Sequence, residues 1–168
     1  MYTHYDTKNL MRRAYEKALE SPDPSTQNSA LLVTNMGSLA WIVAEDVNRF
    51  PDGVEYTPER WERPLKYSYV EHAERNVIYQ LARKGYPTEG LVMISCWACC
   101  SDCGRAIIQA GIKKLVTHKQ AVDRSPPFWA EEVKVAYTML HEAGVELEFL
   151  DATFGGIEIR HTGEVWRP

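Results

Sequence analysis

The sequence predicts an α/β fold in which a sheet with parallel strands carries helices on both faces. From residue 70 to residue 150, helix-favouring segments alternate with short apolar segments, a pattern typical of parallel strands joined by helical crossovers. Ahead of them, two apolar segments flank a turn marked by Asn35 and Gly37, the pattern of an antiparallel hairpin. We therefore expect a mixed sheet.

The first half of the chain is expected to hold one helix, two strands and a long loop. Apolar residues recur at helical spacing over residues 6–20, and the two prolines of SPDPST end that helix. Strands follow at 29–34 and 38–47 around the turn NMGS. Residues 48–67 contain three prolines and many charges, which predicts a surface loop holding one short helix.

The second half is expected to alternate helices and strands and to end in a hairpin. A glycine closes each of the first two helices, as is common at helix C-termini. The expected segments are the helix in YVEHAERNVIYQLARKG, the strand LVMISCW, the helix SDCGRAIIQAG, a strand over 113–118, a helix over about 129–143, a strand over 145–150 and a hairpin tail over 153–168 turning at HTG.

Composition limits the classes of protein and partner. The 168 residues are 45% hydrophobic and 25% charged, which is ordinary for a globular protein, and we expect a single domain over 1–168. The formal charge of −4 argues against a surface that tracks a nucleic-acid backbone. No segment has the length of a membrane span or a signal peptide, which predicts a cytoplasmic protein, in the host cytoplasm if phage-encoded.

All four cysteines lie within eight positions, at Cys96, Cys99, Cys100 and Cys103. In a reducing compartment such a cluster indicates metal ligands or reactive thiols rather than disulfides, and adjacent cysteines also make poor disulfide geometry. A catalytic zinc needs three protein ligands and an open fourth position. His72 is the candidate third ligand.

The segments HAE and CSDC each open an expected helix, and a single strand separates the two helices. Both helix starts should therefore lie at the same edge of the sheet, so that His72, Cys100 and Cys103 converge. The positive end of a helix dipole also stabilises the thiolate that zinc requires.

His-x-Glu followed by Cys-x-x-Cys resembles the signature of the zinc-dependent nucleoside and nucleotide deaminases. The segment CCSDCGRAIIQAGIKKLV is similar to the second half of that signature, with Cys99 where proline is usual. Cys96 and Cys99 form a second Cys-x-x-Cys pair, but the downstream RAIIQAGI fixes the register on Cys100 and Cys103.

The resemblance is stronger to one branch, the deoxycytidylate (dCMP) deaminases, over roughly residues 10–150. SPDPSTQNSALLV, DVNRFPDGV and ERPLKYSYVEHAERNVI are similar to segments of that branch, with departures at Val47 and Arg49 beside Asn48. The resemblance implies a three-layer α/β/α fold with a central mixed five-stranded sheet. It also implies hydrolysis of dCMP to dUMP and ammonia, with dCTP and dTTP as effectors bound with Mg²⁺, and a homo-oligomer, by resemblance a hexamer.

The resemblance also implies roles for individual residues. Zn²⁺ would be held by His72, Cys100 and Cys103 and leave its fourth position to water, while Glu74 would shuttle protons. By resemblance, Asn48 would also contact the sugar and the Ala73 backbone the base. From residue chemistry and position, Trp97 is a candidate neighbour of the base, and the hydroxyls and loop N–H groups of Ser25 and Thr26 are candidates for the 5′-phosphate. Arg83 and Arg49 are candidates for a substrate or effector phosphate, with a contact across a subunit interface as the alternative for Arg83.

Several alternatives stay open. The substrate is alternatively a modified cytosine nucleotide, another nucleoside or a tRNA adenosine, or the chain is a catalytically silent, zinc-stabilised nucleotide-binding protein. Cys99 would allow a closed structural zinc site, and Cys96 is expected in the core. Trp97 is equally compatible with a core position. Arg60, Arg63 and Lys66 alternate with glutamates as in a solvated face, with phosphate binding as the alternative, and His4, His118, His141 and His161 are expected in surface or loop positions without a role.

Overall fold

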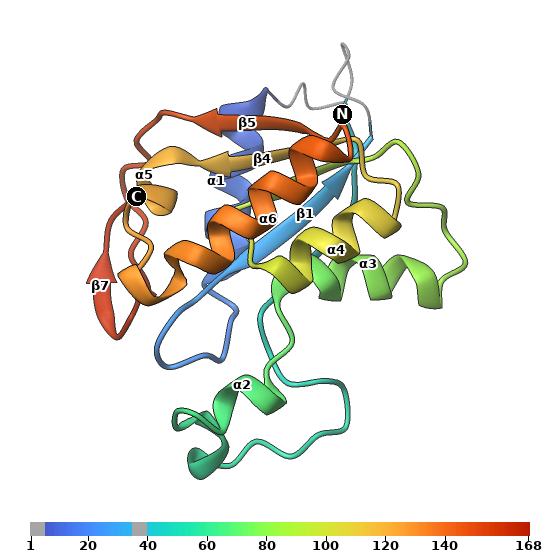
Figure 1. Cartoon of the computed structure of the whole chain (residues 1–168). Helices are drawn as coiled ribbons and strands as arrows, with labels where there is room; N and C mark the ends of the chain where they lie inside the picture. The colour runs from blue at the N-terminus through green and yellow to red at the C-terminus, as the bar shows by residue number, and fades with distance from the viewer. Residues whose placement is uncertain (1–5, 35–39) are drawn as a thin grey trace.

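A computed structural model describes residues 6–34 and 40–168, and its centre is a five-stranded sheet of order β2-β1-β3-β4-β5. β1 runs antiparallel to both of its neighbours, whereas β3, β4 and β5 are parallel (Figure 1). The predicted mixed sheet is therefore confirmed. The strand bounds are β1 Ser29–Val33, β2 Ile42–Val47, β3 Val92–Ser95, β4 Lys114–His118 and β5 Glu146–Leu150.

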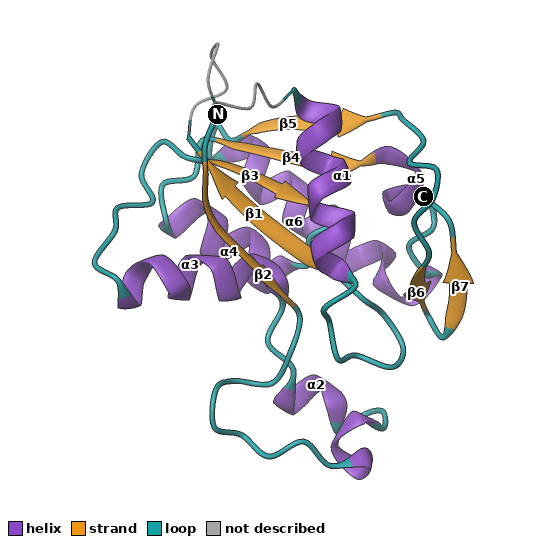
Figure 2. Cartoon of the chain, turned by 180° about the vertical axis from the view of Figure 1, so that it is seen from behind, coloured by secondary structure: helices purple, strands orange, loops and turns teal. Residues whose placement is uncertain are grey.

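Helices cover both faces of this sheet and complete the predicted three layers. Figure 2 shows α1 against one face and α3, α4 and α6 behind the other. A hydrophobic core lies on each face of the sheet, and β1 contributes to both. Leu31 points to the α1 side and Leu32 to the opposite side, because side chains alternate along a strand. The helix bounds are α1 Thr7–Ala18, α3 Ala73–Arg83, α4 Ser101–Gln109, α5 Lys119–Asp123 and α6 Ala130–Glu142.

Shorter elements fill the connections. The loop between β2 and α3 contains the 3-10 helix η1 Pro58–Trp61 and the helix α2 Lys66–Tyr69, where one short helix was expected, and it extends away from the layers (Figures 1 and 2). A second 3-10 helix, η2 Pro127–Trp129, precedes α6. The expected turn at Asn35 and Gly37, like His4, lies outside the described residues.

The C-terminal tail forms the hairpin of β6 Ile159–His161 and β7 Glu164–Trp166. Its anchor is a buried aromatic cluster that includes Tyr15, His118 and Trp166. His118 Nε2 donates to the Ala152 carbonyl at 2.9 Å, so Nδ1 accepts from the Tyr15 hydroxyl at 2.6 Å. The expectation of a surface or loop position for His118 is wrong, because the side chain is fully buried at the end of β4.

Candidate active site

The three predicted zinc ligands come together where two helices begin. His72 is the N-cap of α3, Cys100 is the N-cap of α4, and Cys103 lies in the first turn of α4. The Nδ1 and Sγ atoms of this triad all lie within 4.8 Å of one another. The convergence expected from the two helix starts is thus present in the structure.

The spacing within the triad fits zinc. Nδ1 of His72 lies 3.5 Å from Sγ of Cys100 and 3.5 Å from Sγ of Cys103. Ordinary Zn–N and Zn–S bond lengths in a tetrahedron place such a pair of ligand atoms about 3.6 Å apart. Contact with Cys103 and burial raise the pKa of the Cys100 thiol well above its usual value, so a bound cation is needed to hold it as thiolate.

Arg75 supports the triad from outside. Its guanidinium donates to Cys103 Sγ at 3.5 Å and also to the carboxylate of Glu71, which fixes its direction. A cation next to a ligating sulfur offsets part of the negative charge that two thiolates bring to the site. The sequence analysis did not single out this residue.

The Glu74 carboxylate lies directly beside the triad and is buried, with 1% of its surface exposed. Oε1 accepts from Ser95 Oγ at 2.5 Å and from Asn28 Nδ2 at 3.2 Å. Oε2 lies 3.5 Å from Cys103 Sγ. One carboxylate oxygen is therefore fixed by the protein, and the other faces the ligand triad.

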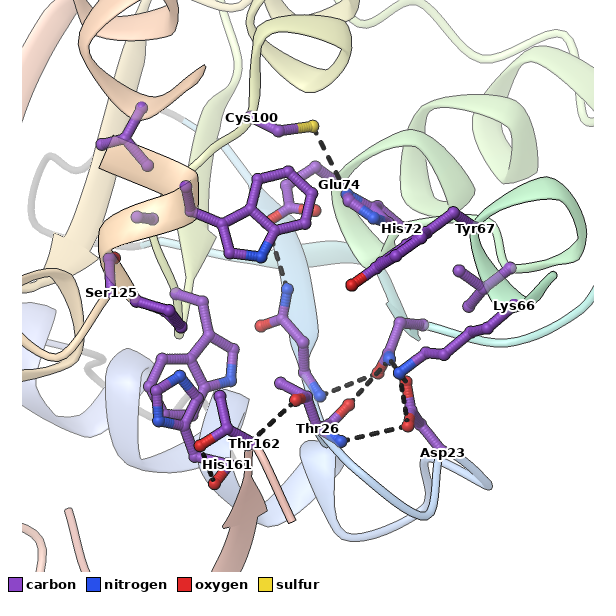
Figure 3. Close-up of a pocket in the computed structure, with 18 of the residues that line it drawn as sticks. Asp23, Thr26, Lys66, Tyr67, His72, Glu74, Cys100, Ser125, His161 and Thr162 are labelled. Carbon is purple, nitrogen blue, oxygen red and sulfur yellow. Dashed lines mark hydrogen bonds and ion pairs between the residues drawn. The ribbon is translucent and has the colours of Figure 1, made fainter. Parts of the chain in front are cut away.

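A pocket opens in front of the triad. Figure 3 shows His72, Glu74 and Cys100 at one end of it and Thr26, His161 and Thr162 at the other. Further lining comes from residues of the β2–α3 loop and from the segment before α6, among them Arg63, Lys66, Tyr67 and Trp129. The two ends of the pocket therefore come from different elements of the fold.

The loop that carries Ser25 and Thr26 is held by buried polar contacts. Asp23 Oδ1 accepts from the backbone N–H groups of both residues, at 2.8 and 3.0 Å, and the carboxylate pairs with Lys66 Nζ at 2.6 Å. These N–H groups are therefore occupied, which corrects the expectation that they bind an anion. Lys66 is buried rather than part of a solvated face.

The Asn48 amide lines the pocket and completes the support of this loop. Oδ1 accepts from Ser21 Oγ and from Asn28 N, and Nδ2 donates to Asp23 and to the Thr26 carbonyl, all within 2.7–2.8 Å. The predicted contact of Asn48 with a sugar stays a prediction. The same holds for Ala73, which is buried between His72 and Glu74.

Trp97 lines the pocket and connects it to the C-terminal hairpin. Its Nε1 donates to the Gln27 carbonyl at 2.8 Å, and the ring of His161 stacks on it with centroids 3.9 Å apart. His161 was expected to have no role. Its position could not be found from local sequence, because it depends on hydrogen bonds that backbone N–H groups of the hairpin donate to the side chains of Gln27 and Thr26, more than 130 residues earlier.

Arg49 and Arg83 lie together but outside this pocket. Both pair with Asp52, Arg83 at 2.7 Å and Arg49 at 2.5 Å, and Arg49 also pairs with Asp46. They line a separate surface depression beside α3. The substrate-phosphate role considered for them is therefore not supported by their position, and the effector role stays a prediction.

The two other cysteines are buried outside the ligand triad. Cys96 lies in the core against Ser29, and burial raises the pKa of its thiol to about 12, as expected for a core residue. Cys99 donates to the Cys100 carbonyl at 3.2 Å. The expected register, with Cys100 and Cys103 facing His72, is the one that the geometry shows.

Comparison with known proteins agrees with this site. A family model described as the cytidine and deoxycytidylate deaminase zinc-binding region matches residues 4–119. An uncharacterized deaminase from the luxG 3′ region of Aliivibrio fischeri is 34% identical over 130 residues, which are 77% of this chain and 83% of that protein. Deoxycytidylate deaminase of Mus musculus is 31% identical over 142 residues, 81% of this chain and 74% of the mouse protein.

A solved structure supports the fold. The crystal structure of dCMP deaminase from the cyanophage S-TIM5 in complex with dCMP and dUMP matches with a TM-score of 0.62 at 22% identity, over 88% of this chain and 100% of that one. Fold, ligand triad and sequence matches together define a zinc-binding deaminase. Within that class, the chain belongs to the cytidine and deoxycytidylate deaminase family. No helix in the described ranges has the length and apolar character of a membrane span.

Proposed function

We propose that the protein hydrolyses dCMP to dUMP and ammonia. The observation that carries this proposal is the buried Glu74 carboxylate, which has one oxygen fixed and the other directed to the His72, Cys100 and Cys103 triad. A structural zinc site has no need of an uncoordinated carboxylate beside its ligands. The relatives named deoxycytidylate deaminase support the choice of substrate.

A bound zinc supplies the Lewis acidity that makes water nucleophilic near neutral pH. Glu74 Oε2 accepts a proton as water adds to C4 of the cytosine, and passes it to N3. The carboxylate then takes the proton of the new C4 hydroxyl and delivers it to the amino group. The C4–N bond breaks, ammonia leaves, and uracil with its C4 carbonyl remains. Ser95 and Asn28 hold Oε1 throughout, so the proton-carrying oxygen keeps its direction.

The far end of the pocket suits the 5′-phosphate. The Thr162 backbone N–H donates to Thr26 Oγ1 at 3.1 Å, which leaves the Thr26 hydroxyl proton free to bind an anion. Arg63 donates to Ser25 Oγ at 3.2 Å and forms no ion pair within the described residues. His161 also lines the pocket, and its ring nitrogens have no hydrogen-bond partner within the described residues. These groups together form the proposed phosphate subsite.

The test is ammonia release from dCMP by zinc-loaded protein, with Glu74→Gln as the variant. The isosteric amide keeps the shape of the site but cannot accept and return protons, so we expect a fall in kcat of about 1000-fold with about one zinc per chain retained. Wild-type protein without turnover of dCMP, CMP, deoxycytidine or dCTP would refute the proposal. It would favour a modified base or a silent nucleotide-binding protein instead.

Regulation and assembly are separate predictions. Binding of dCTP or dTTP with Mg²⁺ and formation of a hexamer follow from the resemblance stated above, and residues of this chain that bear on them are Arg49 and Arg83 in their surface depression. Turnover of dCMP with and without dCTP tests the first. Light scattering of the zinc-loaded protein tests the second.

A further inference from the structure

Asn28 lines the pocket and carries a buried acceptor atom without a hydrogen-bond partner within the described residues. The residue immediately precedes β1, lines the pocket, and is about nine-tenths buried. Its Oδ1 is buried and has no hydrogen-bond partner within the described residues. A buried carbonyl oxygen without a donor destabilises the fold, so a protein rarely keeps one without a use.

The orientation of the amide follows from its neighbour. Nδ2 donates to Glu74 Oε1 at 3.2 Å, and a carboxylate can only accept, so the atom that faces Glu74 must be the nitrogen. The backbone on either side is also fixed, since Asn28 N donates to Asn48 Oδ1 and the Asn28 carbonyl accepts from Asn48 N. Rotation of the amide to satisfy Oδ1 within the protein would break the bond to Glu74.

The matching ligand group is a hydrogen-bond donor close to the atoms that Glu74 serves. In the reaction proposed above, Glu74 delivers a proton to the 4-amino group, so that group must come within reach of the Glu74 carboxylate. Asn28 is hydrogen-bonded to the same carboxylate and therefore lies next to it. The 4-amino group of cytosine carries two N–H donors, whereas the C4 oxygen of uracil carries none.

We propose that Asn28 is a substrate-orienting residue whose Oδ1 accepts a hydrogen bond from the 4-amino group of the cytosine base. The contact turns the amino group toward Glu74 and distinguishes the substrate from its product. After hydrolysis the C4 carbonyl faces Oδ1 as a second acceptor, which weakens binding of the product. The inference rests on the proposed deaminase function and adds to it the residue that recognises the leaving group.

Binding measurements separate this role from simple support of Glu74. In zinc-loaded protein carrying Glu74→Gln, which slows turnover, the dissociation constants of dCMP and dUMP are measured with and without Asn28→Val. We expect Asn28→Val to weaken dCMP binding by about tenfold or more and to leave dUMP binding unchanged or tighter. Asn28→Ala serves as a second variant if unfolding temperatures show that valine disturbs the loop.

Ser95→Ala is the matched control, because Ser95 donates to the same Glu74 oxygen but does not line the pocket. It should leave the ratio of the two dissociation constants unchanged. Equal weakening of dCMP and dUMP by Asn28→Val, or no weakening of either, would overturn the inference. Absence of dCMP turnover by the wild-type protein would instead overturn the proposed function, so the two failures are distinct.

Discussion

The buried ion pair between Lys66 and Asp23 provides a quantitative test of how the pocket is held together. The two side chains are 6% and 1% exposed, and their charged atoms are 2.6 Å apart. Lys66→Met removes the cation, keeps a similar volume, and leaves the carboxylate buried. Breaking one side of a buried pair typically costs about 3–5 kcal/mol. Asp23 keeps its bonds from Ser25, Thr26 and Asn48, so we expect a value near the lower limit.

For a chain of this size, about 3 kcal/mol corresponds to a fall in Tm of roughly 6–12 °C. Thermal unfolding of the zinc-loaded protein, followed by circular dichroism, measures it. Lys119→Met is the control, because Lys119 pairs with Asp123 on the surface, where both side chains are about half exposed. An exposed pair contributes about 0–1 kcal/mol, so its Tm should move by only a few degrees. Equal shifts for the two variants would refute the structural role given to Lys66.

Two further predictions concern histidines, His161 in the C-terminal hairpin and His118 at the end of β4. His161→Phe keeps the stack on Trp97 but removes the ring nitrogens, so kcat/KM for dCMP should fall about tenfold while kcat/KM for deoxycytidine stays unchanged. The control is Arg160→Ala, because Arg160 is an exposed cation on the same strand. This control should leave the ratio of the two kcat/KM values as in the wild type. Burial lowers the pKa of His118, so the unfolded chain binds the proton more readily and stability should decrease as the pH falls below about 6.5. His118→Gln should flatten the dependence of Tm on pH between 7 and 5, and an unchanged slope would contradict this assignment.

The convergence of the candidate zinc ligands could be predicted because each belongs to a short motif at a helix start, where local spacing determines geometry. The same local reasoning misplaced Lys66 as surface, because the alternating charges around it are typical of a solvated face. Its ammonium in fact points inward to Asp23, 43 positions earlier in the chain. Asn28 gave no signal either, since its importance depends on the Glu74 carboxylate that folding places beside it. Contacts of this kind follow from tertiary packing and cannot be predicted from residue spacing.

The site divides into two parts that the sequence supplies separately. The ligand triad, Glu74 and Asn28 all lie within residues 4–119, the part of the chain that matches the family model. The hairpin that closes the far end of the pocket begins at Ile159 and lies outside that match. Trp97 links the two, because it follows β3, donates to the Gln27 carbonyl and stacks on His161. On the proposed assignments, changes in the hairpin should therefore alter recognition of the 5′-phosphate without moving the triad and Glu74, whereas changes at Asn28 should alter recognition of the base.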